Sequence, residues 1–307
     1  MSNITAAMVK DLRDKTGAGM MDCKAALNEN AGDMEAAIDW LRKKGLSKAA
    51  KKAGRVAAEG LIGVAVGGDA GALVEVNAET DFVARNEQFK DFVARTAKIA
   101  LEEAGDLDRL LKKTIEGSRS VSETLTEMVA KIGENMSVRR AVMLGVSEGA
   151  VASYVHNAAS PELGKIGVLV ALKSKADKAK LAALGKQIAM HIAAAAPLAL
   201  TPEHLPAEVV ARERTVQADI ARQSGKPESV VEKMMEGRMR KFYQETVLLH
   251  QTFVIDGETS IAKVLEKAGK DFGAPVEIEG YVRFQVGEGI EKAESDFADE
   301  VNKMAGN

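Results

Sequence analysis

The sequence LIGVAVGGDAGALVEV, residues 61–76, decides the fold. Two short runs, Leu61–Val66 and Ala72–Val76, are rich in valine, leucine and isoleucine, and they flank the segment Gly67-Gly68-Asp69-Ala70-Gly71. Glycine and aspartate between two such runs are typical of a β-hairpin. We therefore expect two antiparallel strands here.

Strand-like and helical patterns follow this hairpin in two cycles. The further predicted strands are Arg140–Val146, Val151–Val155, Ile166–Leu172 and the alternating run Val276–Val286. The predicted helices are lined by Phe89, Phe92, Val93 and Ala97, by Leu125, Met128, Val129 and Ile132, and by Leu181, Leu184, Ile188 and Ile192. Because strand-rich segments are associated with helices twice, the pattern predicts an α+β protein with two related subdomains.

Residues 1–45 read as three short helices. Ile4, Met8 and Leu12 recur at four-residue spacing, and Asp33 can cap the third helix. Three helices of this length predict a small module with a core of its own. An alanine-rich connector follows, with Lys48, Lys51, Lys52 and Arg55 on it, and a solvated basic face is a commoner outcome there than a nucleic-acid site.

Two helical segments near the C-terminal end carry many charges. Residues 207–224 and 228–245 are separated by Ser224-Gly225-Lys226-Pro227, which predicts an antiparallel helical hairpin. Such a hairpin either projects toward a partner or packs flat on its own domain. An apolar stripe in Glu288–Met304 predicts a terminal helix that packs on the body or on another protein.

Composition limits the class of protein. A net charge of −3 and an aromatic content of 4% argue against a nucleic acid as the main partner. Cys23 is the only cysteine, which excludes an intrachain disulfide and a CxxC zinc site. Residues 1–25 lack an apolar signal-peptide stretch, and no run approaches the roughly 20 apolar residues of a membrane span. We expect a cytoplasmic protein with no membrane contact.

Sequence motifs of catalysis are absent. The Gly-Lys pairs, such as Gly164-Lys165, lack the upstream glycine and following hydroxyl of a phosphate-binding loop. The four histidines have no metal-binding spacing, and there is no G-x-S-x-G sequence. We therefore expect a binding protein that is not an enzyme, with no catalytic residues, no metal and no cofactor.

The segment Asn77–Asn86, NAETDFVARN, lies where a strand gives way to a helix. Ordinary packing would make Asp81 a helix cap and Phe82 a core residue, seven positions before Phe89 and on the same face. The alternative is that the acid and the aromatic ring serve a partner.

The sequence resembles the elongation factor Ts family. The matching segments occur in the family's order and cover nearly the whole chain, so together they are very specific. They are Glu79–Asn86, Thr16–Leu27, Lys51–Gly60, Ile166–Val170, Glu236–Met239 and Val286–Lys292.

This resemblance implies an architecture that agrees with the pattern. It comprises a ubiquitin-associated-like three-helix module with its connector, a two-subdomain core, an antiparallel helical hairpin and a C-terminal helical module. The expected boundaries are 1–55 for the module, 56–140 and 141–286 for the two core subdomains, about 203–245 for the inserted hairpin and 287–307 for the C-terminal module.

The resemblance also implies a function and its residues. Members of the family promote GDP release from the GTPase elongation factor Tu. Asp81 and Phe82, within Thr80–Val83, match the intruding pair that disturbs the partner's magnesium and nucleotide site. Further matching contact positions are Lys24, Ile132 and Gly133 in Lys131–Asn135, His156 in Ser153–His156, and Met234 and Met235 near the hairpin base.

One departure weakens the assignment of His156. Many members place this histidine only a few residues before Gly-Arg-Ile-Gly-Val-Leu-Val, whereas Asn157–Leu163 lengthens that connection here and Lys165 replaces the arginine. A homodimer within a larger complex stays open. Two rival functions also stay open: an RNA-binding translation factor that uses the basic connector, and an adaptor whose three-helix module binds a ubiquitin-like or chaperone partner.

Overall fold

The hairpin at residues 61–76 forms the middle of the observed sheet. In the computed structural model, which describes residues 4–16, 18–223 and 228–291, β1 (Glu59–Gly67) pairs antiparallel with β2 (Ala70–Ala78). Gly68, at φ +72°, opens the two-residue turn, a conformation that favours glycine. Both strands are longer than the apolar runs that predicted them.

The core consists of two halves with the same topology. In the first, β5 (Met136–Gly145) returns to pair with β2, the second strand of the hairpin. In the second, β6 (Gly149–Ser160) and β7 (Leu163–Lys173) form the hairpin, and β8 (Glu277–Gln285) returns to pair with β7. The fold is therefore α+β, as the sequence predicted, and β5, which crosses the expected boundary at 140/141, belongs to the first half.

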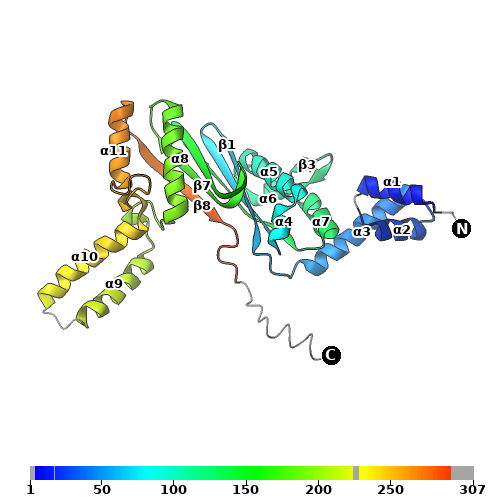
Figure 1. Ribbon diagram of the computed structural model, residues 1–307, viewed down its shortest axis with the longest axis horizontal. Coiled ribbons are helices and arrows are strands. Elements are labelled where there is room, and N and C mark those ends of the chain that lie inside the picture. Colours follow the sequence, from blue (N-terminus) through cyan, green and yellow to red (C-terminus); the bar gives the residue numbers. More distant parts are fainter. Residues whose placement is uncertain (1–3, 17, 224–227, 292–307) are drawn as a thin grey trace.

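Helices occupy the long connection before each returning strand (Figure 1). The first connection contains α4 (Asp81–Arg85), α5 (Glu87–Glu102), α6 (Leu107–Lys112), the small pair β3 (Thr114–Glu116) and β4 (Arg119–Ser120), and α7 (Val121–Ile132). The second contains α8 (Lys178–Ala195), α9 (Ala207–Arg222), α10 (Glu228–Thr246) and α11 (Ile261–Phe272). The pattern had not predicted α4, α6, α11 or the β3–β4 pair.

Strand alternation sends neighbouring side chains into different cores. On β1, Leu61 and Ala65 pack in a cluster with Phe89 of α5, whereas Ile62 and Val64 pack in another cluster with Leu169 of β7. A third cluster lies between the second half's strands and the helices α8 and α11. Each half thus has its own core, and an apolar layer joins them.

Backbone pairing between β1 and β7 also joins the halves, along a short stretch of each strand. Ile62 and Gly63 of β1 pair with Gly164 and Leu163 of β7, and the amide of Val64 donates to the carbonyl of Glu162 at 2.9 Å. The lengthened connection Asn157–Leu163 therefore extends the β6–β7 hairpin, with a bulge between Ala158 and Ser160, until it reaches β1. This pairing produces the six-stranded sheet.

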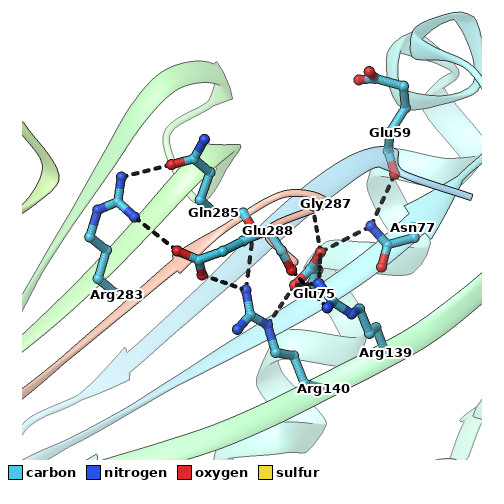
Figure 2. A network of polar contacts seen from close by, with 9 residues as sticks. All are labelled: Glu59, Glu75, Asn77, Arg139, Arg140, Arg283, Gln285, Gly287 and Glu288. Carbon is cyan, nitrogen blue, oxygen red and sulfur yellow. Dashed lines mark hydrogen bonds and ion pairs between the residues drawn. The ribbon is translucent and has the colours of Figure 1, made fainter. Parts of the chain in front are cut away.

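A buried carboxylate lies at the same junction. Glu75 of β2 is fully buried and accepts hydrogen bonds from Arg139, Arg140 and Asn77 and from the backbone amide of Gly287 (Figure 2). Gly287 follows β8, so one side chain of the first half holds the end of the second. Burial alone would raise the pKa of Glu75, but these hydrogen bonds lower it below its ordinary value.

The N-terminal module has the three predicted helices, α1 (Ala6–Thr16), α2 (Met20–Glu29) and α3 (Met34–Lys52). Leu12, Cys23 and Leu27 are fully buried among them, and Asp33 caps α3 by accepting from the amide of Ala36. Most of the expected connector belongs to α3, because this helix continues to Lys52 and packs against α7 (Figure 1).

The helical hairpin α9–α10 projects away from the sheet (Figure 1), which excludes flat packing of the hairpin on its own domain. At its base, Val210, Phe242 and Tyr243 pack against buried Ala199, Leu205 and Val247. The structure describes the chain only to residue 291. The predicted terminal helix at Glu288–Met304 and the C-terminal module at 287–307 therefore lie outside the described residues from position 292 onward. Residues 286–289 form a turn.

Candidate functional site

The candidate site is the turn that leads from β2 into α4. Strand β2 ends at Ala78, and Thr80, in extended conformation, occupies the cap position of α4. Val83 and Ala84 of this short helix are buried in the core of the first half. One face of α4 is therefore fixed to the core, and the opposite face is available to solvent.

Phe82 lies on that opposite face and is 76% exposed. The spacing of seven residues from Phe89 would align both rings on one continuous helix, but the helix stops at Arg85. Asn86 then caps a new helix, α5, by accepting from the amides of Gln88 and Phe89. Phe89 is fully buried, so the break at Asn86 separates a core ring from an exposed one.

Asp81 is the first residue of α4, and Thr80 takes the cap position that packing logic gave to Asp81. The Asp81 carboxylate accepts a hydrogen bond from the Arg85 guanidinium at 2.6 Å, one turn along the helix. The Arg85 side chain is 75% exposed and that of Asp81 is 44% exposed, so this pair adds only about 0.3–0.5 kcal/mol to stability. The acid and the phenyl ring thus stand together on the surface.

The predicted contact positions Ile132 and Gly133 are near this turn. Gly133, at φ +89°, ends α7 in the left-handed conformation. The next residue, Glu134, accepts hydrogen bonds from the amide of Thr80 at 3.0 Å and from its hydroxyl at 2.9 Å. The structure therefore joins Thr80–Val83 with Ile132–Gly133.

The remaining predicted residues lie on other elements. Lys24 is exposed on α2, beside the exposed Met20 and Met21 at the start of that helix. His156 is exposed on β6, where its Nδ1 lies 3.2 Å from the hydroxyl of Tyr154. Met234 and Met235 are half-buried on α10, in the part of that helix that follows its start at Glu228, so they lie nearer the turn between α9 and α10 than the base predicted for them. The predicted set is spread over module, core and hairpin.

Sequence reasoning gave no role to Glu79, Glu134 or Asn135, although they lie in the quoted motifs. The Glu79 carboxylate accepts from the amide of Asn135, and the Asn135 side chain donates to the carbonyl of Arg55 at 2.7 Å. The resemblance of Glu79–Asn86 and Lys131–Asn135 to a known family was the only signal that could have indicated them.

The basic connector is partly neutralised. The Lys48 and Lys44 ammonium groups bind the carboxylate of Asp22 at 2.7 and 3.1 Å, and these hydrogen bonds lower the pKa of Asp22. Arg55 pairs with Glu79 at 3.4 Å. Two of the four basic residues of the predicted patch are thus engaged within the protein, which weakens the case for an RNA site.

In residues 4–16, 18–223 and 228–291, no group of three or more His, Cys, Asp or Glu side chains is placed to hold a metal ion. No helix in that part of the chain is long and apolar enough to cross a membrane. The buried His191 has a hydrogen-bond partner at each ring nitrogen, which indicates a structural role. Its Nε2 lies 2.9 Å from the Gln251 side-chain oxygen, and its Nδ1 accepts from the amide of Val254.

Comparison with known proteins agrees with this architecture. The model of the family described as Elongation factor TS matches residues 79–288. Similar proteins named Elongation factor Ts occur in Rhodospirillum centenum, 62% identical over the whole of both chains, and in Rhodospirillum rubrum, 62% identical over 98% of each. The protein of that name from Parvibaculum lavamentivorans is 62% identical over 99% of each chain.

Fold, site and relatives together define a translation elongation factor. Because the family model spans more than half of the chain and the relatives align end to end, the chain belongs to the elongation factor Ts family.

Proposed function

We propose that this protein is a guanine nucleotide exchange factor for elongation factor Tu. The observation that carries the proposal is the 76% exposure of Phe82 on a helix whose other face is buried in the core. A large ring kept in solvent next to a carboxylate gains nothing for the free protein. Burial of a phenyl ring in a partner gains roughly 1.5–3 kcal/mol.

The task of such a factor follows from how a GTPase holds its nucleotide. GDP lies in a cradle of backbone amides, and Mg²⁺ requires near-ideal octahedral geometry. Small displacements around the metal therefore weaken binding strongly. Phe82, inserted between elements of the partner, would stabilise a displaced conformation, and Asp81 would compete for polar groups near the metal.

Several contact regions are needed for this effect. A shift of about four orders of magnitude in nucleotide affinity requires about 5.5 kcal/mol of differential binding, more than one ring supplies. Lys24 on α2, Ile132 and Gly133 beside α4, His156 on β6, and Met234 and Met235 on α10 are proposed as further contacts. Coupling is reciprocal, so bound GDP weakens the complex as much as the complex weakens GDP binding.

The protein forms and breaks no covalent bond in this proposal, so it is not an enzyme, and its work belongs in the cytoplasm, where bacterial translation takes place. An RNA-binding factor is the rival function that salt dependence would reveal, because phosphate contacts give steep log–log slopes. An adaptor would bind its partner through residues 1–45 alone.

The test is release of fluorescent GDP from elongation factor Tu with and without this protein. We expect release to accelerate in proportion to the protein concentration until it saturates. If micromolar protein leaves the release rate unchanged, the proposal is wrong.

A further inference from the structure

We propose that Glu134 is a positioning residue for nucleotide exchange, one that fixes the direction in which Phe82 projects. This inference rests on the proposed function. Its structural basis is the clasp, defined here as the three segments 53–55, 79–80 and 133–135 and the hydrogen bonds among them.

The helix that carries Phe82 cannot hold itself in place. With five residues, α4 is too short to be stable alone, because the first helical turn fixes many dihedral angles for a single hydrogen bond. Thr80, its cap residue, makes no side-chain hydrogen bond to the helix. Burial of Val83 and Ala84 fixes one face of α4 to the core, so the start of the helix at Thr80 is the part that another group must hold.

Glu134 supplies that support. Its carboxylate accepts from the amide of Thr80 at 3.0 Å and from the Thr80 hydroxyl at 2.9 and 3.1 Å. Thr80 thus engages both oxygens of the Glu134 carboxylate. A carboxylate that accepts hydrogen bonds from two donor groups of one residue fixes both the position and the rotation of that residue.

Glu79 makes the contact reciprocal. It accepts from the amide of Asn135, the residue after Glu134, while Glu134 accepts from the amide of Thr80, the residue after Glu79. Asn135 then donates to the carbonyl of Arg55, at the end of the α3 connector. Two turns and the connector are thereby held in one arrangement.

The clasp matters for exchange because Phe82 gains little from insertion if its helix must first be ordered. A side chain on a fixed turn loses less conformational freedom on binding than one on a mobile turn. Ile132 and Gly133 directly precede Glu134, so the clasp also fixes the spacing between the two proposed contact points. Its loss should lower the maximal exchange rate more than the affinity for the partner.

The experiment compares Glu134→Ala and Thr80→Val with Glu127→Ala. The control residue lies on α7 and pairs with Arg119, which keeps Glu116 as a second partner. We expect the first two variants to lower the maximal rate of GDP release at saturation by roughly 10-fold, with a smaller change in half-saturating concentration. The control should match the wild type.

Amide hydrogen exchange supplies a readout that does not depend on the partner. The amides of Thr80 and Asn86, which donate to Glu134 and to the carbonyl of Val83, should exchange faster in Glu134→Ala, while those of β2 and α5 keep their protection. Unchanged protection together with an unchanged maximal rate would overturn the positioning role. A wild type without any effect on GDP release would instead defeat the proposed function, and the amide protection would still decide the role of the clasp.

Discussion

The Oε2 atom of Glu75 on β2 lies 2.6 Å from Nε of Arg140 on β5, the neighbouring strand of the first half. Glu75 is fully buried, whereas the arginine side chain is 30% exposed and also reaches Glu288 beyond the end of β8. Figure 2 shows this pair at the centre of a network that joins β2, β5 and the turn after β8. The two halves are thus held together by a charged contact as well as by an apolar layer.

Glu75→Gln should destabilise the protein by roughly 2–3 kcal/mol, because it leaves two arginines without a buried counter-charge. The matched control is Glu288→Gln, which removes an exposed partner of the same arginine and should cost under about 1 kcal/mol. Urea unfolding measures both. Equal midpoints for Glu75→Gln and the wild type would show that the network carries no net stability.

The same carboxylate should contribute to acid denaturation. The pKa of Glu75 is lowered in the folded state, so its contribution is complete above the ordinary glutamate value of 4.5 and is lost as the pH falls through the folded pKa. The difference in unfolding free energy between wild type and Glu75→Gln should therefore shrink below about pH 4.5. A constant difference down to pH 2 would contradict this.

Phe82→Ala should leave the melting temperature nearly unchanged, because the ring is exposed. It should slow GDP release by roughly 10- to 100-fold, equivalent to about 1.4–2.8 kcal/mol. Phe89→Ala is the contrast, since truncation of that buried ring should cost about 3–5 kcal/mol of stability. A sharp fall in melting temperature with normal exchange by Phe82→Ala would make Phe82 a structural residue.

Asp81→Asn tests the charge beside the ring. Its stability should change by less than about 0.5 kcal/mol, because only an exposed pair with Arg85 is lost. Arg85→Gln removes the same pair and keeps the acid. If the charge acts on the partner, GDP release slows in Asp81→Asn alone. Slowing in both variants would assign the effect to the pair, and normal release by both would make the charge irrelevant.

His191 should make stability fall at mildly acidic pH. Burial lowers its pKa, and Nδ1 already accepts from the amide of Val254, so a proton there has no acceptor. Because the folded pKa is depressed, the stability is complete above the ordinary value of 6.5 and declines as the pH falls toward the folded pKa.

The variant His191→Gln should flatten the decline below pH 6.5, measured by urea unfolding at each pH. His250→Gln, at an exposed position, is the control and should keep the slope of the wild type. Identical slopes in all three proteins would remove His191 from the pH dependence.

Removal of residues 292–307 should leave a folded protein that still reaches the full exchange rate, because Asp81 and Phe82 remain. It should need a higher concentration to reach that rate. Truncation after residue 286 should also destabilise the fold, since Gly287 and Glu288 bind the Glu75 network. Titrations of elongation factor Tu with residues 1–291 check the first point. A lowered plateau would mean that the terminal segment takes part in the exchange step.

Much of the fold followed from periodicity. The hairpin at 61–76, the returning strand at 276–286 and the helices lined by Phe89 and Ile188 are each specified by local pattern. Helix α4 could not be predicted this way, because five residues show no period, and Asn86 reads as an ordinary position within a longer helix. Periodicity alone therefore predicts a core position for Phe82, and only the resemblance to a family argues against it.

The burial of Glu75 could not be predicted from the sequence, for a different reason. An acid in a strand of valines and leucines reads as a solvent-facing residue. Its burial depends on Arg139 and Arg140, more than sixty positions later, and on the amide of Gly287, 212 positions later. Glu134 is similar, since its role requires Thr80 on another turn. Pairings across such separations have no periodicity to reveal them.

The duplicated topology has a consequence for protein engineering. Both halves place their additional elements at the same point, between the first long helix after the hairpin and the returning strand. One copy uses that point for α6 and α7, of which α7 packs against α3 of the N-terminal module, and the other uses it for the projecting α9–α10 pair. We therefore expect this connection to accept grafts: the α9–α10 arm should tolerate shortening, exchange or a tag while the strands keep their pairing and the three apolar clusters keep their packing.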